Sequence, residues 1–171
     1  MVSPSTYYRS SKHSRYILDR MTHEELSRSW ATVIDALEDD MGFLKPHMER
    51  LYALLRIVAG FMFTLHGLQK IFGMFGGVPP EAPPFIVYGA GGLELAAGVL
   101  IAIGLFVEPV AFIASGEMAV AFFLGHVMPK GSIVPIVNGG ELAALYCWLF
   151  LFIAAKGAGI WSIDAARAKR G

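Results

Sequence analysis

The sequence contains few charged residues and a single cysteine. Asp, Glu, Lys and Arg make up 16% of its 171 residues, whereas a typical soluble domain contains about 25%. The 14 basic and 14 acidic residues give a net charge of zero, which argues against the basic surface of a nucleic-acid-binding protein. The one cysteine, Cys147, excludes an internal disulfide, a Cys-x-x-Cys redox pair and an iron–sulfur cluster held by this chain alone.

The charges that are present lie mostly near the beginning of the chain. The first 50 residues hold 7 of the 14 basic and 8 of the 14 acidic residues, while the remaining 121 are largely apolar. Residues 1–20 have no apolar core of the kind found in signal peptides, so we expect no cleaved signal. The sequence therefore predicts a polar extension over residues 1–50, a membrane domain over 51–164 and a basic tail over 165–171.

Long apolar runs define the membrane domain. Each run is close to the ~20 residues that cross ~30 Å of hydrocarbon at 1.5 Å per residue. Only helices or closed barrels satisfy their backbone groups in lipid, and runs without alternation are helices. We therefore predict an all-α, integral membrane four-helix bundle. Its spans are about 51–73, 85–107, 109–127 and 138–157.

Capping and packing residues refine these spans. Pro109 is expected to open the third helix, and Asn138 to cap the fourth with Glu141 three residues later as its capping-box partner. Small residues spaced four apart in the second span favour close helix approach. These pairs are Gly92 with Ala96 and Gly98 with Ala102.

Basic residues predict the orientation in the membrane. Lys45 and Arg50 precede the first span, and the tail 165–171 carries three more basic residues. In the two outer loops, by contrast, the one basic residue is Lys130. Because Lys and Arg are enriched on the cytoplasmic side, we expect both termini in the cytoplasm and the chain in the bacterial cytoplasmic (inner) membrane.

An amphipathic helix is expected over residues 22–41, ahead of the membrane domain. Thr22 and Glu25 have the spacing of a capping box. An apolar stripe follows at helical spacing, formed by Leu26, Trp30, Val33 and Leu37. The opposite face is acidic, which argues against binding to anionic lipid. We therefore expect residues 1–50 to contact other subunits of a membrane complex, with packing back on the helix bundle as the alternative.

Eight polar or charged residues interrupt the apolar runs. Charges inside spans cost ~2.5–3.5 kcal/mol each on insertion scales, so they are paired, lie beside water or have a function. The residues are Arg56, His66, Gln69, Lys70, Glu94, Glu117, His126 and Glu141, with Asn138 at the start of the fourth span.

The spacing of these residues predicts that several of them meet. His66, Gln69 and Lys70 share one helix face, and Glu94 and Glu117 are expected near mid-depth in their spans. Two bases facing three acids suit either proton-coupled chemistry or a buried salt-bridge network. We expect His66, Lys70, Glu94 and Glu117 to be catalytic. The binding residues are expected to be His66, Gln69, Lys70, His126, Asn138 and Glu141.

Other interpretations of these residues remain open. Glu141 can equally be a capping residue with no role in a site. Lys70 can be a side chain that reaches the outer interface. Arg56 can belong to a structural network. His126 lies nine residues after Glu117, which places the two about 180° apart on a straight α-helix. That rotation argues against a bis-histidine haem with His66. No Glu-x-x-His pair lies inside the spans, and we expect no metal.

The polar residues and their surroundings resemble those of the DoxX family of small four-helix membrane proteins. Five segments match in order over about 51–164. They are RIVAGFMFTLHGLQKIFGMFGG, GLELAAGVLIAIGLF, GEMAVAFFLGHVMPKG, NGGELAALY and GIWSID. The extension 1–50 is longer than the usual amino terminus of the family.

The resemblance implies a function linked to membrane redox complexes. The family name comes from a membrane component linked to thiosulfate:quinone oxidoreductase. We therefore expect a redox-linked subunit that handles quinone or quinol, with a non-catalytic accessory or assembly subunit as the alternative. Whether the chain is an enzyme, and whether it forms a homo-oligomer, stays open at this point.

Overall fold

The computed structural model describes the backbone of residues 22–170 and the side chains of residues 22–35 and 42–170. The predictions for residues 1–20 lie outside this range. Every regular element within it is helical, as the apolar runs predict, and no strand occurs in the described part. These residues belong to two compact units divided after His47.

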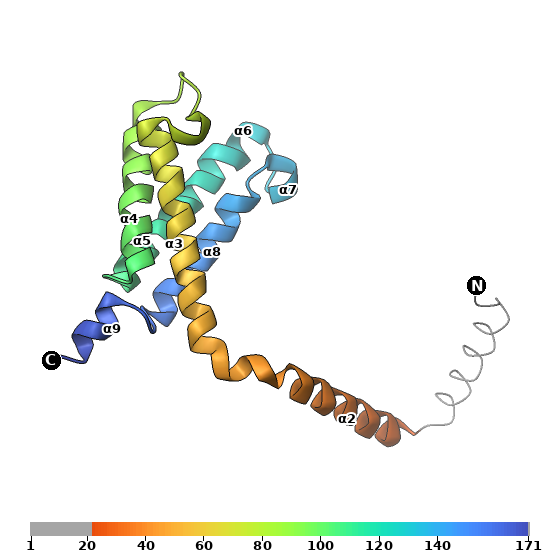
Figure 1. The fold of residues 1–171 in the computed structure, drawn as a ribbon. Helices are drawn as coiled ribbons and strands as arrows, with labels where there is room; N and C mark the ends of the chain where they lie inside the picture. The colour runs from red at the N-terminus through yellow and green to blue at the C-terminus, as the bar shows by residue number, and fades with distance from the viewer. Residues whose placement is uncertain (1–21, 171) are drawn as a thin grey trace, which may run out of the picture. The chain divides into compact units, whose positions relative to one another are not determined.

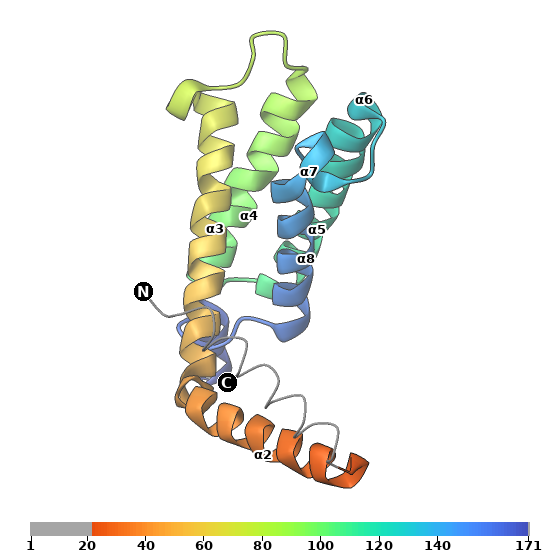
Figure 2. The same ribbon diagram turned by 90° about the vertical axis from the view of Figure 1, so that its right-hand side faces the viewer.

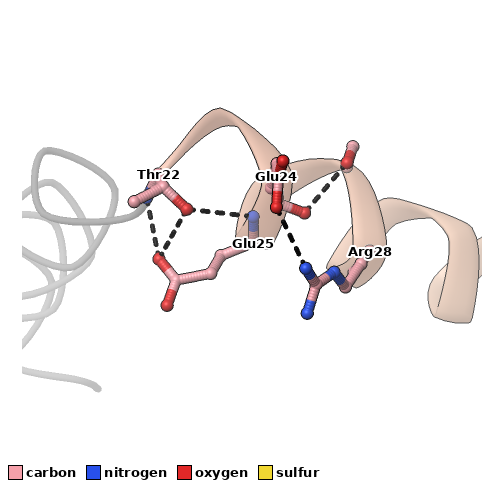
Figure 3. Close-up of polar contacts among 5 residues, drawn as sticks. Thr22, Glu24, Glu25 and Arg28 are labelled. Atoms are coloured by element: carbon pink, nitrogen blue, oxygen red, sulfur yellow. Dashed lines mark hydrogen bonds and ion pairs between the residues drawn. The ribbon is translucent and has the colours of Figure 1, made fainter.

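The first unit contains the predicted amphipathic helix, α2 (His23–Met41). Figure 3 shows the capping box at its start, where the backbone N–H of Glu25 donates to Thr22 Oγ1 at 3.3 Å and the backbone N–H of Thr22 donates to Glu25 Oε2 at 2.8 Å. The bonds from Thr22 hold the pKa of Glu25 below its usual value, because they favour the charged carboxylate. The capping-box prediction is therefore confirmed.

The second unit contains four long helical segments. The first is α3 (Met48–Phe72). A π-helical stretch, η3 (Phe85–Ala90), leads into α4 (Gly91–Ile103), and α5 (Val107–Val120) leads into a second π-helical stretch, η4 (Ala121–Val127). The last is α8 (Glu141–Lys156). In both ribbon views α3 lies beside α4, and α5 lies beside α8 (Figures 1 and 2).

Short helices close the two ends of this unit. A turn of 3-10 helix, η2 (Met74–Gly76), follows α3. α6 (Met128–Lys130) and α7 (Pro135–Asn138) connect η4 to α8 at one end, and α9 (Ile163–Ala168) lies at the other end, near the turn between α4 and α5 (Figures 1 and 2).

Three of the helices are long and apolar enough to cross a membrane. They are Gly42–Phe72, Phe85–Ile103 and Val107–Lys130. The fourth predicted span corresponds to α8, which has 16 residues and a length of about 24 Å. That is shorter than the ~30 Å hydrocarbon layer, so α8 alone does not meet the length expected of a span.

The helix ends differ from the sequence prediction at two turns. The second helix ends at Ile103, and the chain turns through left-handed residues at Gly104 (φ 73°) and Phe106 (φ 53°). The third helix then begins at Val107, two residues before Pro109, because the side chain of Asp164 accepts a hydrogen bond from the Val107 N–H at 3.1 Å. This contact from the end of the chain caps the helix in place of a local residue.

Asn138 was wrongly predicted to cap the fourth helix. The residue before α8 is Gly140, and no side chain caps it. Asn138 ends α7 instead, where its Oδ1 accepts from the Gly140 N–H at 2.7 Å and its Nδ2 donates to the carbonyl of Ser132 at 2.9 Å. It therefore shapes the turn between α7 and α8.

Glycine allows α3 and α4 to pack with their backbones in contact. A Cβ atom on Gly98 would come within 2.5 Å of the Thr64 backbone nitrogen, and one on Gly67 would overlap the backbone of Leu95. The predicted role of Gly98 is confirmed. Gly92 was wrongly assigned to this interface, because a Cβ there would meet nothing within 4 Å.

Replacing Gly67 with alanine should therefore destabilise the protein by about 1–3 kcal/mol, because the added methyl group pushes backbone against backbone. Gly116, where an added Cβ meets nothing within 4 Å, is the matched control. Gly116→Ala should leave stability unchanged or raise it by up to about 1 kcal/mol through helix propensity. Thermal unfolding in detergent measures both effects, and equal melting temperatures for the two variants would contradict the proposed contact.

Large aromatic side chains connect the α3–α4 pair to the α5–α8 pair. Phe63 on α3 contacts Tyr146 and Phe150 on α8, with ring centroids 5.6 and 4.7 Å apart. Phe63 and Phe150 are fully buried. These aromatic side chains therefore join the two helix pairs within a core that also contains aliphatic residues.

Candidate functional site

An ion pair between α3 and α4 forms the first part of the candidate site. Lys70 Nζ lies 2.6 Å from Glu94 Oε1 and 2.5 Å from Oε2. The side chain of Glu94 is 4% exposed and that of Lys70 18% exposed. Lys70 therefore turns inward to Glu94, and the alternative of a lysine that reaches the interface does not describe this structure.

Gly91 makes this ion pair possible. A Cβ atom at Gly91 would lie 2.7 Å from Lys70 Cβ and 3.2 Å from Ile71 Cγ1. Because there is no side chain at this position, the lysine stem passes against the α4 backbone and reaches Glu94 one turn further along. The spacing of small residues in the sequence did not single out Gly91.

Glu117 on α5 contributes a second buried carboxylate. Both of its carboxylate oxygens are buried, and within residues 22–170 neither has a hydrogen-bond partner. Glu94 and Lys70 both lie within electrostatic range of this group. Buried polar atoms in folded proteins nearly always have a partner, so Glu117 is a group that a bound ligand would satisfy.

Tyr146 on α8 is a site residue that the sequence analysis missed. Its hydroxyl is also buried without a partner among the described residues, and the residue is 5% exposed. Glu94 acts electrostatically on this hydroxyl, and the rings of Tyr146 and His66 lie nearly perpendicular with their centroids 6.2 Å apart. A tyrosine inside an apolar run was the available signal, because a buried tyrosine hydroxyl needs a partner.

Five side chains from four helices thus converge, and we call them the polar cluster. They are His66 and Lys70 on α3, Glu94 on α4, Glu117 on α5 and Tyr146 on α8. The cluster contains one lysine for two carboxylates. Since Lys70 bonds both oxygens of Glu94, Glu117 is left without a cation of its own in the described residues.

The two π-helical stretches flank the polar cluster. Glu94 lies four residues after the end of η3, and Glu117 lies four residues before the start of η4. π-Helical turns occur frequently at functional sites. An extra residue per turn also changes the rotation of everything beyond it, which bears on where His126 points.

His126, in η4, lies apart from the polar cluster. Its Nδ1 is 3.3 Å from the backbone carbonyl of Asn138, and a Cβ on Gly140 would approach its side chain at 3.0 Å. His126 therefore packs against the α7–α8 turn. The structure gives it this contact rather than a place opposite His66.

Two more of the predicted binding residues have no hydrogen bond or ion pair with the polar cluster among the described residues. Glu141 is the first residue of α8 and is exposed. Gln69 is half-buried on α3. Among the described residues there is also no group of three or more His, Cys, Asp or Glu side chains that could hold a metal ion.

Arg56 lies far from the polar cluster and holds the opposite end of the helices together. It is fully buried. Its Nη1 donates to the carbonyls of Ile101 and Ala102 at 2.5 and 2.9 Å, and its Nη2 donates to that of Trp161 at 2.8 Å. Since the last carbonyls of a helix lack partners within it, Arg56 completes the end of α4 and attaches the segment before α9.

Comparisons with known proteins show what this chain is similar to. The DoxX family model matches residues 51–127. An uncharacterized protein of Haemophilus influenzae is 42% identical over 129 residues, which cover 72% of this chain and 96% of that protein. A Bacillus subtilis protein named "Putative oxidoreductase CatD" is 27% identical over 117 residues, or 65% of this chain and 82% of that protein. No solved structure is a significant match.

Proposed function

Because this chain belongs to the DoxX family of membrane proteins, we propose that it is a redox-linked membrane subunit that binds a quinone or quinol head group at the polar cluster. One observation carries this proposal. Glu117 and Tyr146 present buried oxygens without partners, on two helices that face the Lys70–Glu94 pair. A ligand that both donates and accepts hydrogen bonds satisfies them.

The residues of the polar cluster fit such a head group. A bound quinone supplies an acceptor for two electrons and two protons. Tyr146 donates a hydrogen bond to a ring oxygen, and His66 and Lys70 are the further donors. An ammonium group has three N–H bonds, so Lys70 retains one donor while it holds both oxygens of Glu94.

Glu117 carries the proton in this proposal. It has no cation of its own in the described residues, whereas Glu94 is neutralised by Lys70. Glu117 therefore accepts a proton from the ligand hydroxyl or returns it. A redox centre on a partner subunit would supply or take up the two electrons. The description of the B. subtilis relative as an oxidoreductase agrees with this chemistry.

We further propose that the second unit is a four-helix bundle in the bacterial cytoplasmic membrane. α8 is the fourth span in this proposal, because it lies along α5, which belongs to a helix long and apolar enough to cross a membrane. Arg50 and Lys169 lie at the same end of the unit, and Lys130 ends α6 at the other. By the positive-inside rule, the end with Arg50 and Lys169 is cytoplasmic.

Glu117→Gln tests the site. The variant keeps the shape of the side chain but loses the charge. We therefore expect quinone affinity to fall at least about 10-fold, which corresponds to the loss of a hydrogen bond to a charged group. Glu141→Gln, the same change at an exposed position of α8, should leave affinity unchanged. The measurement is quinone content by lipid extraction and native mass spectrometry. Purified protein without bound quinone and without quinone-dependent activity would refute the proposal.

A second candidate function is that of an accessory subunit without catalysis. The observation that favours it is the apolar face of α2, where Trp30 is 61% exposed, Ile34 53% and Val33 44%. An exposed apolar face of this kind indicates a protein interaction site. In this alternative the charged pairs stabilise the fold, and residues 1–50 dock on a larger complex.

Deleting residues 1–45 tests this docking. We expect the shortened protein to lose its partner on gentle extraction, while the membrane domain keeps its melting temperature, because residues 48–170 belong to a separate unit. Trp30→Ala in the full chain should weaken the same association by about 2 kcal/mol or more if Trp30 is a hot spot. Co-purification that survives both changes would contradict the docking role.

A further inference from the structure

A hollow at the proposed cytoplasmic end lies outside the polar cluster. Its volume is about 950 Å³, and it is formed between the start of α3 and the segment that includes α9. The side chains of Arg50 and Lys169 line it, together with the ring of Trp161 and a wall of small residues. Those small residues are Ala158, Gly159, Ala165, Ala166 and Ala168.

The acidic side chains of this hollow are already engaged. Glu49 accepts a hydrogen bond from Lys156 Nζ at 2.7 Å. Asp164 accepts from the Val107 N–H at 3.1 Å, and its charge is offset by the Arg56 guanidinium, which lies within electrostatic range. Among the side chains of residues 22–35 and 42–170, by contrast, neither Arg50 nor Lys169 has a hydrogen-bond or ion-pair partner. The hollow therefore has two available positive charges above a mainly apolar floor.

One aromatic residue, Trp161, lines the hollow, and a second, Phe106, lies beside Arg167 of α9. Trp161 is 56% exposed and adopts a left-handed backbone (φ 55°), and Phe106 is 54% exposed with the Arg167 guanidinium 5.7 Å from its ring centroid. Trp and Tyr gather at the level of lipid head groups, and basic pockets on the cytoplasmic side of membrane proteins hold anionic lipid head groups.

We propose that this hollow binds the phosphate of an anionic phospholipid, with Arg50 and Lys169 contacting the head group and Trp161 lying against the upper acyl chain. Charge complementarity favours this occupant, because two unengaged cations meet one phosphate. The apolar wall fits the part of a lipid below its head group. A soluble phosphate compound would leave that wall exposed to water.

Lipid titration of the full-length protein tests the proposal. Detergent-solubilised protein is titrated with phosphatidylglycerol or phosphatidylcholine, and bound lipids are counted by native mass spectrometry. Each cation is expected to contribute about fivefold. Arg50→Gln with Lys169→Gln should therefore lower the affinity for phosphatidylglycerol roughly 30-fold and leave that for phosphatidylcholine unchanged.

Two controls make the outcome specific. Lys130→Gln removes a cation at the other end of the unit and should have no effect. Arg50→Lys with Lys169→Arg keeps both charges and should retain the preference for phosphatidylglycerol. A fall of less than about threefold in the double glutamine variant, or an equal fall with Lys130→Gln, overturns the proposal. Full competition by glycerol 3-phosphate also overturns it, because the occupant would then be a soluble phosphate.

Discussion

Arg56→Gln should lower the free energy of unfolding by about 3–5 kcal/mol. The guanidinium is fully buried and donates to carbonyls at the end of α4 and before α9. Glutamine reaches at most one of these sides, so buried carbonyls lose their partners. Asp164, which acts electrostatically on Arg56, loses a favourable charge as well.

The measurement is thermal unfolding by circular dichroism in a zwitterionic detergent. A loss of this size corresponds to roughly 6–20 °C for a chain of this length. Arg50→Gln, the same substitution at an exposed position of the same helix, should change stability by less than about 0.5 kcal/mol. If the Arg56→Gln and Arg50→Gln variants have the same melting temperature, Arg56 does not hold the end of α4 to the segment before α9 as described. Arg56→Lys should recover only part of the lost stability. It keeps the positive charge, but one ammonium group replaces a planar fork of donors.

The sequence predicted the helices well because lipid imposes a simple requirement. A span must be long, apolar and helical, and these properties are visible residue by residue. α3, α4 with η3, and α5 with η4 each begin and end within a few residues of the predicted spans. The turns were predicted less well, because α5 is capped by Asp164 from a distant part of the chain.

The site was predictable only in its charged members. A carboxylate at mid-depth such as Glu94 has no interface to reach, so burial follows from position alone. Glu141 carries the same group near a helix start, where solvent is within reach, and the sequence could not separate these two cases. Tyr146 was not predicted as a site residue, because a tyrosine within an apolar run is assigned to the apolar core until the neighbours of its hydroxyl are known.

Rotation about the helix axis was the other missing quantity. Helical spacing of 3.6 residues per turn assigns faces correctly only along an unbroken α-helix. η4 interrupts this spacing between Glu117 and His126, and no feature of the apolar run marks a π-helical stretch. Similarly, the α3–α4 contact uses Gly91 and Gly98 rather than Gly92, a shift of one residue that only the packed partner decides.

The second large effect is expected at the Lys70–Glu94 pair. Lys70→Met should destabilise the protein by about 3–5 kcal/mol at neutral pH, because Glu94 is left as a buried charge without a partner. Adding Glu94→Gln removes that charge. The double variant should recover most of the lost stability, since replacing both members of a buried ion pair is often neutral.

This rescue distinguishes a binding site from a structural network. If the pair only stabilises the fold, the double variant regains both melting temperature and any activity of the complex. If Lys70 donates to a ligand, the double variant regains its melting temperature but stays deficient in quinone binding. Thermal unfolding and quinone content measured on the same four proteins (wild type, each single variant and the double variant) give the coupling energy directly. A double variant as unstable as Lys70→Met would contradict the ion pair itself, because the loss would then come from the lysine stem packed against Gly91.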